Sequence, residues 1–236
     1  ATEHLTEAGR SWNLQRLFAR KFLICQMARF CASLSETLSA SAWTGDLFFM
    51  DLDGVLDADH IGFPHTTMNG LNAVHLLQSH GYSIVVSTAR SVEQVRHYCE
   101  IYGFPGGLAE HGSVFVDRVG QREVPLIDEE AADQLDKCRE ALANMPGVLV
   151  DPEHQYSGHA WRFNNLKQKC LSEAEIQDVL VRFNLSRLDY INTTADTTII
   201  QRGGGKGQGL LAVKDYLRCQ IRSVAAMGDT DADLQM

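Results

Sequence analysis

Short apolar runs that each end in a polar turn constrain the fold of this chain more than any other feature. They are residues 47 to 50 (LFFM) before the turn DLDGVLD, 82 to 86 (YSIVV) before STAR, and 223 to 227 (SVAAM) before GDTDAD. Helical periodicity separates these runs, over about residues 68 to 80, 92 to 102 and 209 to 217. Because apolar strands that alternate with helices are typical of buried parallel sheets, the sequence predicts an α/β fold with right-handed crossovers.

A different pattern occupies the middle of the chain. Strand-like runs (VFVD, GVLVD, HAWRF, RLDYINT and TTII) mix there with amphipathic helices over about residues 129 to 144 and 172 to 183. This mixture predicts a small α+β insertion. We therefore predict three parts: an N-terminal helical extension over residues 1–45, a Rossmann-like parallel-sheet core over 46–113 and 200–236, and the insertion over 114–199.

The composition is that of a globular protein and limits its partners. The 236 residues are 44% hydrophobic and 22% charged, with a formal net charge of -9. The acidic balance disfavours nucleic-acid binding, and the apolar runs are far shorter than the ~18 residues of a membrane span. Six cysteines lack a CxxC pair, so we expect reduced thiols in a cytoplasmic protein. The basic N-terminal residues allow a transit peptide, but Glu3 and Glu7 fit one poorly. The apolar spacing favours one packed face of a helix, formed by Leu14, Leu17, Phe18, Phe22 and Cys25.

Carboxylates and a hydroxyl follow the predicted strands at their carboxyl ends, where an open parallel sheet gathers its loops. They are Asp51 and Asp53 after LFFM, Thr88 after SIVV, and Asp229 and Asp233 after SVAAM. Carboxylates crowded at one edge repel one another unless a cation joins them, and oxygen ligands with room for waters suit Mg²⁺. The sequence therefore predicts a Mg²⁺ site at this edge.

The pair Asp51 and Asp53 predicts phosphoryl transfer. Residues two apart in an extended turn point to the same side, so both carboxylates can face one substrate. One attacks phosphorus and forms an aspartyl phosphate, while the other, kept protonated by its neighbour's charge, protonates the leaving oxygen and later activates water. Gly54 lets the backbone approach closely and leaves its amide free for a phosphate oxygen.

Four motifs, DLDGVL, STAR, GGGKGQG and GDTDAD, resemble in order and spacing the signature motifs of the haloacid dehalogenase superfamily. The resemblance covers residues 47 to 236. Length and pattern are similar to the branch with an inserted α/β cap, which includes trehalose-phosphate, sucrose-phosphate and Cof-type phosphatases. The resemblance implies that Asp51 is the nucleophile and a metal ligand, and that Asp53 is the acid/base whose main-chain carbonyl also binds metal.

The resemblance also implies roles for the other motif residues. Thr88 is the expected phosphate-binding hydroxyl, and Lys206 resembles the lysine that neutralises the nucleophile and the phosphoryl oxygens. Asp229 is the expected third protein ligand of Mg²⁺, and Asp233 an outer-sphere acid at the metal. The remaining motif residues are expected to bind substrate: Gly54, Ala89 and Arg90.

Substrate-selecting residues are expected in the insertion. HAWRF resembles the HYR-type strand of trehalose-, sucrose- and mannosylglycerate-phosphate phosphatases, and residues 110 to 112 match their ENG-like turn. This implies that His159 and Arg162 point at a sugar phosphate from the cap. The alternative is an exposed cap strand with a surface arginine.

Two other kinds of site are disfavoured by spacing. His154 and His159 belong to no HExxH motif and have no carboxylate partner at the usual spacing, so we predict no transition-metal site there. GGGKGQG is not a phosphate-binding P-loop, because Lys206 is followed by Gly207 in place of Ser or Thr.

The sequence thus predicts a Mg²⁺-dependent phosphatase that hydrolyses a small phosphomonoester, with a sugar phosphate as the expected substrate class. A phosphomutase of the same fold is one alternative. The other is a phosphate-sensing or interaction domain with weakened catalysis, because Ala232 replaces the polar residue of the common GDxxND motif and removes a hydrogen bond that orients the loop. Relatives continue beyond the fourth motif, so we expect a core truncated at its C-terminus and a possible fusion to an upstream domain.

Overall fold

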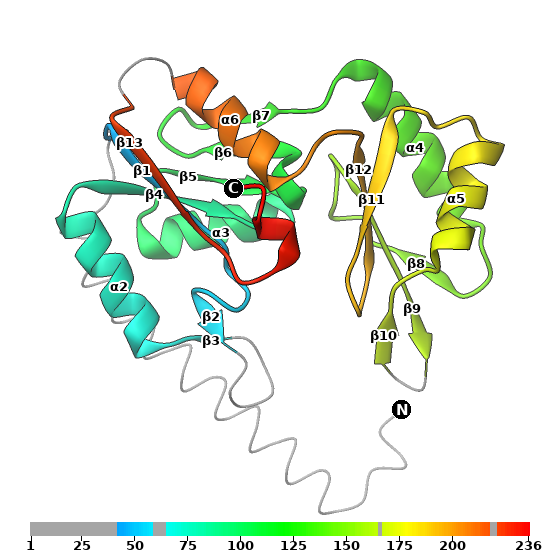
Figure 1. Cartoon of the computed structure of the whole chain (residues 1–236), viewed down its shortest axis with the longest axis horizontal. Helices are drawn as coiled ribbons and strands as arrows, with labels where there is room; N and C mark the ends of the chain where they lie inside the picture. Colours follow the sequence, from blue (N-terminus) through cyan, green and yellow to red (C-terminus); the bar gives the residue numbers. More distant parts are fainter. Residues whose placement is uncertain (1–41, 59–64, 165–166, 218–220) are drawn as a thin grey trace, which may run out of the picture.

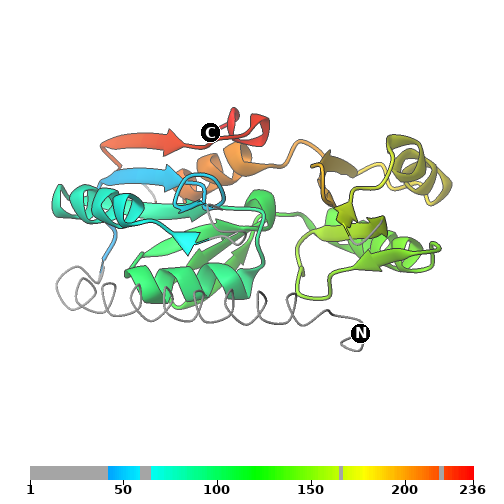
Figure 2. The same cartoon turned by 90° about the horizontal axis from the view of Figure 1, so that it is seen from below.

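The computed structural model describes residues 42–58, 65–164, 167–217 and 221–236 (Figure 1). These residues form two lobes that stand side by side in both views (Figures 1 and 2). We call residues 42–125 and 202–236 the core lobe and residues 126–201 the cap. The predicted helical extension over residues 1–45 lies outside the described residues except for its last four.

The core lobe contains a six-stranded sheet in the order β13-β1-β4-β5-β6-β7. Its parallel strands are β1 (Asp46–Met50), β4 (Tyr82–Ser87), β5 (Gly106–Ala109) and β13 (Ser223–Met227). Two antiparallel strands, β6 (Val114–Asp117) and β7 (Arg122–Pro125), extend it at one edge. A small hairpin of β2 (Asp57–Ala58) and β3 (His65–Thr66) follows β1. The predicted α/β fold with a parallel-sheet core is confirmed.

Helices cover both faces of this sheet and enclose two hydrophobic clusters. On one face lie α2 (Met68–Ser79) and α3 (Val92–Tyr102), and on the other lies α6 (Lys206–Leu217) (Figure 2). Thr67 and Ser91 cap the first two helices, and Gly103 ends α3 in the left-handed conformation. In the part of the chain that the structure describes, no helix is both long and apolar enough to cross a membrane.

The cap contains a five-stranded antiparallel sheet. Its strands are β8 (Val148–Val150), β9 (Gly158–Asn164), β10 (Lys167–Lys169), β11 (Leu188–Asn192) and β12 (Thr197–Gln201). One face is covered by α4 (Glu129–Ala143) and α5 (Glu173–Arg182), which share a hydrophobic cluster with it. In β9, Ala160 belongs to that cluster. Because side chains alternate along a strand, His159 and Trp161 lie on the opposite face of the sheet.

The predicted boundary between core and insertion at residue 113 lies too early. The run VFVD forms β6, which pairs antiparallel with β5 of the core sheet, and β7 pairs with β6. The core sheet therefore continues to Pro125, and the cap begins after it. A short apolar run has the same pattern as an antiparallel edge strand of one sheet or as a strand of another, so the sequence alone does not separate the two.

Strand register brings the predicted motifs to one edge of the core sheet. Met50 of β1 aligns with Val86 of β4 on one side and with Met227 of β13 on the other. The residues that follow these three strands therefore leave the sheet next to one another, at its carboxyl edge. This placement follows from parallel pairing, since antiparallel neighbours would send their loops to opposite edges.

We expect Phe115→Ala in β6 to lower the free energy of unfolding by about 3 to 5 kcal/mol, because it opens a cavity in the core. Phe115 is fully buried in the cluster between the sheet and α6. The matched control is Phe183→Ala at the end of α5, where the side chain is 48% exposed. That change is expected to alter stability by about 0.5 kcal/mol or less in urea denaturation. Equal losses in both variants would contradict the placement of β6 in the core.

Candidate active site

A buried lysine joins two aspartates from distant parts of the core lobe. The Lys206 ammonium, at the first residue of α6, lies 2.9 Å from Asp51 Oδ2 and 2.6 Å from Asp233 Oδ1. The other oxygen of Asp51 accepts a hydrogen bond of 2.7 Å from the Leu52 amide. All three charged side chains are at most 7% exposed. The predicted nucleophile and the predicted lysine are therefore in direct contact.

The two aspartates respond differently to the lysine they share. Burial raises the pKa of Asp51 to about 6, although the charge of Lys206 acts in the opposite direction. Burial also acts to raise the pKa of Asp233, but hydrogen bonds from Lys206 and Thr230 lower it overall. The negative charge of Asp233 also raises the pKa of Asp51, whereas Asp233 accepts hydrogen bonds from Thr230 in addition to the one from Lys206.

Those additional hydrogen bonds hold the loop after β13. Asp233 Oδ2 accepts from the amide of Asp229 at 3.3 Å, and from the amide and hydroxyl of Thr230 at 3.1 and 2.7 Å. Thr230 and Asp233 thus form a capping box around the short 3₁₀ turn Asp231–Asp233. Ala232 was expected to leave this loop without an orienting hydrogen bond. In the structure Asp233 supplies that orientation.

Three carboxylates converge at this point, and they fit a hard divalent cation. Ligand oxygens of Asp51, Asp229 and Asp233 all lie within 4.8 Å of one another. Three negative charges face the single positive charge of Lys206, and carboxylate oxygens are the ligands that Mg²⁺ prefers. The predicted metal ligands Asp51, Asp229 and Asp233 are therefore brought together. Asp53 is predicted to bind the metal through its main-chain carbonyl, and its side chain is not part of this group.

Gly54 makes room for one of these carboxylates. A Cβ atom at this position would lie 1.9 Å from Asp229 Oδ2, and the backbone has φ +89°, which favours glycine. The sequence predicts that another group approaches the Gly54 backbone closely, and in the structure that group is the Asp229 carboxylate. The prediction that the Gly54 amide is free for a phosphate oxygen is wrong in this structure, because the amide donates to the Asp57 carbonyl at 2.8 Å.

Asp53 and Arg90, predicted as acid/base and substrate ligand, bind each other. Arg90 Nε lies 3.0 Å from Asp53 Oδ2, and Arg90 Nη2 lies 2.5 Å from Oδ1. The remaining amino group of Arg90 donates to the Tyr98 hydroxyl at 2.9 Å, and that hydroxyl donates to Asp57. Asp53 is half-exposed, whereas Asp57 is buried. The guanidinium therefore fixes Asp53 at the rim of the site.

The segment that follows β4 is held from several sides. Thr88 is fully buried, and its hydroxyl accepts a hydrogen bond of 3.3 Å from the Arg90 amide. The carbonyls of Thr88 and Arg90 accept from the amides of His111 and Glu110 at 3.0 and 2.9 Å. The carbonyl of Ala89 lies 3.1 Å from a ring nitrogen of a cap residue, His154. Thr88, Ala89 and Arg90 are thus placed together beside the Asp51 loop.

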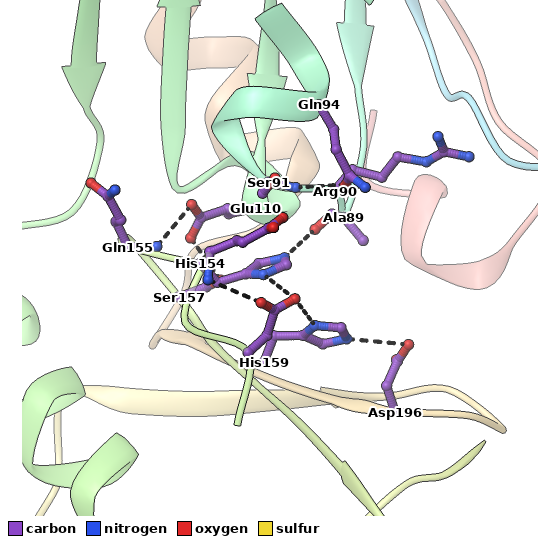
Figure 3. Close-up of polar contacts among 12 residues, drawn as sticks. Ala89, Arg90, Ser91, Gln94, Glu110, His154, Gln155, Ser157, His159 and Asp196 are labelled. Carbon is purple, nitrogen blue, oxygen red and sulfur yellow. Dashed lines mark hydrogen bonds and ion pairs between the residues drawn. The ribbon is translucent and has the colours of Figure 1, made fainter. Parts of the chain in front are cut away.

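Glu110 links the two lobes, a role that the sequence did not reveal. Its carboxylate is fully buried and accepts from the amides of Gln155 and Tyr156 at 3.0 and 2.8 Å (Figure 3). The hydroxyl of Ser157 donates to the same carboxylate at 2.9 Å. Glu110 adopts a left-handed φ of 53°, which is uncommon outside glycine. The resemblance to an ENG-like turn marked this residue, but nothing in the sequence placed its partners in the cap.

The two substrate residues predicted in the cap lie on opposite faces of its sheet. His159 lies on the face away from α4 and α5, and its ring contacts that of His154. Arg162 pairs with Glu175 of α5 at 2.5 Å, on the helix-covered face. The structure therefore does not bring Arg162 to the site. His159 and Arg162 are three residues apart in one strand, so their side chains point to opposite faces of the sheet and cannot both reach one ligand.

The two histidines also have carboxylate partners that spacing did not indicate. His154 and His159 both contact Asp151, and His159 contacts Asp196 as well. Burial opposes the charged form of His159, yet hydrogen bonds to Asp196 and Asp151 raise its pKa overall. The sequence shows no carboxylate partner at the usual motif spacing, but the cap fold brings two carboxylates to these histidines.

The arrangement of the two lobes identifies the fold. A parallel sheet with helices on both faces and an inserted cap make up the haloacid dehalogenase fold with a cap domain. No protein-family model and no curated protein sequence matches the chain.

Several solved structures are similar to this chain in fold. A haloalkanoate-superfamily phosphatase from Bacteroides thetaiotaomicron is 17% identical with a TM-score of 0.60, over 81% of this chain and 80% of that one. The C-terminal domain of trehalose-6-phosphate phosphatase from C. albicans is 15% identical, with a TM-score of 0.57 over 89% and 76% of the chains. Sucrose-phosphatase from Synechocystis, solved with sucrose and phosphate, is 14% identical, with a TM-score of 0.54 over 81% and 78%. At these identities the likeness establishes the fold.

We expect Asp51→Asn to stabilise the metal-free protein at pH 7, because the buried Asp51 side chain is ionised at that pH and burial disfavours its charge. Its pKa is about 6 in the folded protein and 3.8 without the fold. At about 1.4 kcal/mol per pKa unit, the variant should gain about 2 to 3 kcal/mol in free energy of unfolding. A carboxyl with a raised folded pKa loses stability as the pH rises from about 4 to about 6, so the gain should vanish near pH 4.

Urea denaturation in the presence of a chelator at both pH values measures this effect. Asp215→Asn, an exposed position on α6, is the matched control and should change stability at neither pH. Destabilisation by Asp51→Asn at pH 7 would show that the contact with Lys206 outweighs the penalty of burying the charge.

Proposed function

We propose that this protein is a Mg²⁺-dependent phosphatase that hydrolyses a small phosphomonoester through an aspartyl phosphate on Asp51. One observation carries the proposal. A buried aspartate contacts a buried lysine, and two further carboxylates lie within ligand distance of the same point. A nucleophile, a cation for the phosphoryl oxygens and a ligand set for Mg²⁺ therefore share one site.

The residues of this chain divide the reaction between them. Bound Mg²⁺ would offset the negative charges of Asp51 and of the phosphate dianion. An oxygen of Asp51 attacks phosphorus, and the bond from phosphorus to the ester oxygen breaks. Lys206 attracts the phosphoryl oxygens, and the hydroxyl of Thr88 holds one of them. Asp53 donates a proton to the departing oxygen and then takes one from the water that hydrolyses the aspartyl phosphate.

The contact between Arg90 and Asp53 must break before Asp53 can act as the acid. The Arg90 guanidinium occupies both oxygens of Asp53 in the structure. Asp53 must leave Arg90 and take up a proton from solvent before it can protonate the leaving oxygen, and a bound phosphate ester offers the guanidinium a replacement anion. Substrate binding would thus free Asp53 to become the acid.

A sugar phosphate is the proposed substrate class. Trehalose-6-phosphate phosphatase and sucrose-phosphatase, each with a TM-score above 0.5, act on such compounds by their names. We expect such a small-molecule enzyme, with no nucleic-acid partner, to act in the cytoplasm.

Two alternatives remain within the same fold. A phosphomutase would return the phosphoryl group to a substrate and release little free phosphate. A phosphate sensor would bind phosphate but release none from an ester. The main argument for that alternative is Ala232, which replaces the polar residue of the GDxxND motif. Because Asp233 orients the loop after β13, the structure favours an active enzyme over a sensor.

We expect the full chain to release phosphate from p-nitrophenyl phosphate only when Mg²⁺ is present. Asp51→Asn should lower kcat by about 10³-fold or more, because the nucleophile is lost. Asp53→Asn should lower kcat by about 10² to 10⁴-fold, the usual contribution of a general acid. Steady-state kinetics with and without chelator measures both effects.

Asp215→Asn is again the control and should keep wild-type kinetics. Wild-type protein that binds Mg²⁺ and phosphate but releases no phosphate from any ester would support the sensor. Full activity of Asp51→Asn would reject the aspartyl phosphate.

A further inference from the structure

A second set of metal-ligating side chains lies in the cap, apart from the acidic site. Asp151 follows β8, His154 lies in the loop between β8 and β9, and His159 lies within β9. One ligand atom from each lies within 4.8 Å of the other two. The His154 side chain is 5% exposed, and those of Asp151 and His159 are about one-fifth exposed. The group is thus largely shielded from water.

The distances fit one ion with tetrahedral coordination. Asp151 Oδ2 lies 3.1 Å from His154 Nδ1 and 3.3 Å from His159 Nδ1. Ligands bound to Zn²⁺ at about 2.0 to 2.1 Å stand about 3.3 Å apart along the edge of a tetrahedron. The two distances from the carboxylate oxygen to the Nδ1 atoms are therefore close to the spacing between two ligands of one zinc ion, and all three groups lie within 4.8 Å of one another.

The outer nitrogen of each histidine has the partner expected of a metal-bound imidazole. His154 Nε2 lies 3.1 Å from the carbonyl oxygen of Ala89, and His159 Nε2 lies 3.4 Å from Asp196 Oδ2 (Figure 3). Histidine ligands commonly donate their second N–H to a carbonyl or carboxylate, which fixes the tautomer. With hydrogen on both Nε2 atoms, the two Nδ1 lone pairs converge beside Asp151.

We propose that Asp151, His154 and His159 bind a Zn²⁺ ion, with water in the fourth position. Two imidazoles and one carboxylate suit zinc, whereas Mg²⁺ prefers oxygen ligands alone. Asp196 and the Ala89 carbonyl orient the two rings. The ion ties the loop before β9 to the strand itself and holds His154 against the segment Thr88 to Arg90 of the core lobe.

The contacts of the four ring nitrogens agree with this arrangement. All four face oxygen atoms of carboxylates or of a carbonyl, which only accept hydrogen bonds. With a bound ion, the two inner nitrogens bind the metal through their lone pairs, and the two outer nitrogens keep their N–H···O contacts.

Zinc binding to the full chain tests the proposal. Protein stripped with a chelator is dialysed against Zn²⁺ in excess Mg²⁺, which competes for the acidic site, and bound zinc is counted by mass spectrometry. We expect one zinc per chain, a higher Tm with Zn²⁺ than with Mg²⁺ alone, and the same count in Asp51→Asn. Binding of Co²⁺ should give the visible spectrum of a tetrahedral nitrogen and oxygen site. Absence of bound zinc, or a sulfur charge-transfer band, overturns the proposal.

Variants separate ligands from orienting residues. His159→Gln and Asp151→Asn should each lose the zinc, whereas His97→Gln, exposed on α3, should keep it. Asp196→Ala should keep the stoichiometry but bind zinc about 10 to 100-fold more weakly, as for loss of a hydrogen-bond partner of a ligand. Zinc that is retained by both ligand variants, or lost in Asp51→Asn, rejects this site. If one ligand variant fails to fold, the other variant and the zinc-dependent Tm of the wild type decide.

Discussion

The contact of Lys206 with Asp51 and Asp233 is the interaction on which the candidate site depends. Three charges are buried together there, and the buried ammonium needs its carboxylate partners to offset the loss of hydration. The contact forms only if β1 and β13 pair in parallel and α6 begins beside their ends. The same pairing that completes the core sheet therefore assembles the acidic site.

Much of this arrangement could be predicted, because it follows from local pattern and sheet geometry. The helix expected over residues 92 to 102 is present, since Ser91 and Gly103 mark its ends as well as its periodicity does. Asp51, Asp229 and Asp233 were expected to meet because parallel strands gather their loops at one edge, and their oxygens do lie together. These predictions needed only residue order and strand direction.

The remaining features depend on tertiary pairing that a single sequence does not contain. Arg162 was assigned to the site by its motif, but alternation along β9 turns it toward Glu175 and the helices. The carboxylates beside His154 and His159 belong to Asp151, which follows β8, and to Asp196, which lies between β11 and β12. Glu110 finds its partners in the cap, some 45 residues farther along the chain. None of these contacts has a fixed spacing to search for.

The segment Thr88 to Arg90 of the core lobe also contacts the cap. Arg90 holds Asp53, the carbonyl of Ala89 faces His154 of the cap, and the amides of Glu110 and His111 donate to the carbonyls of Arg90 and Thr88. Glu110 in turn binds the cap loop through its carboxylate. Because the same three residues contact both the proposed acid and the cap, this segment is the structural link between Asp53 and the cap loop.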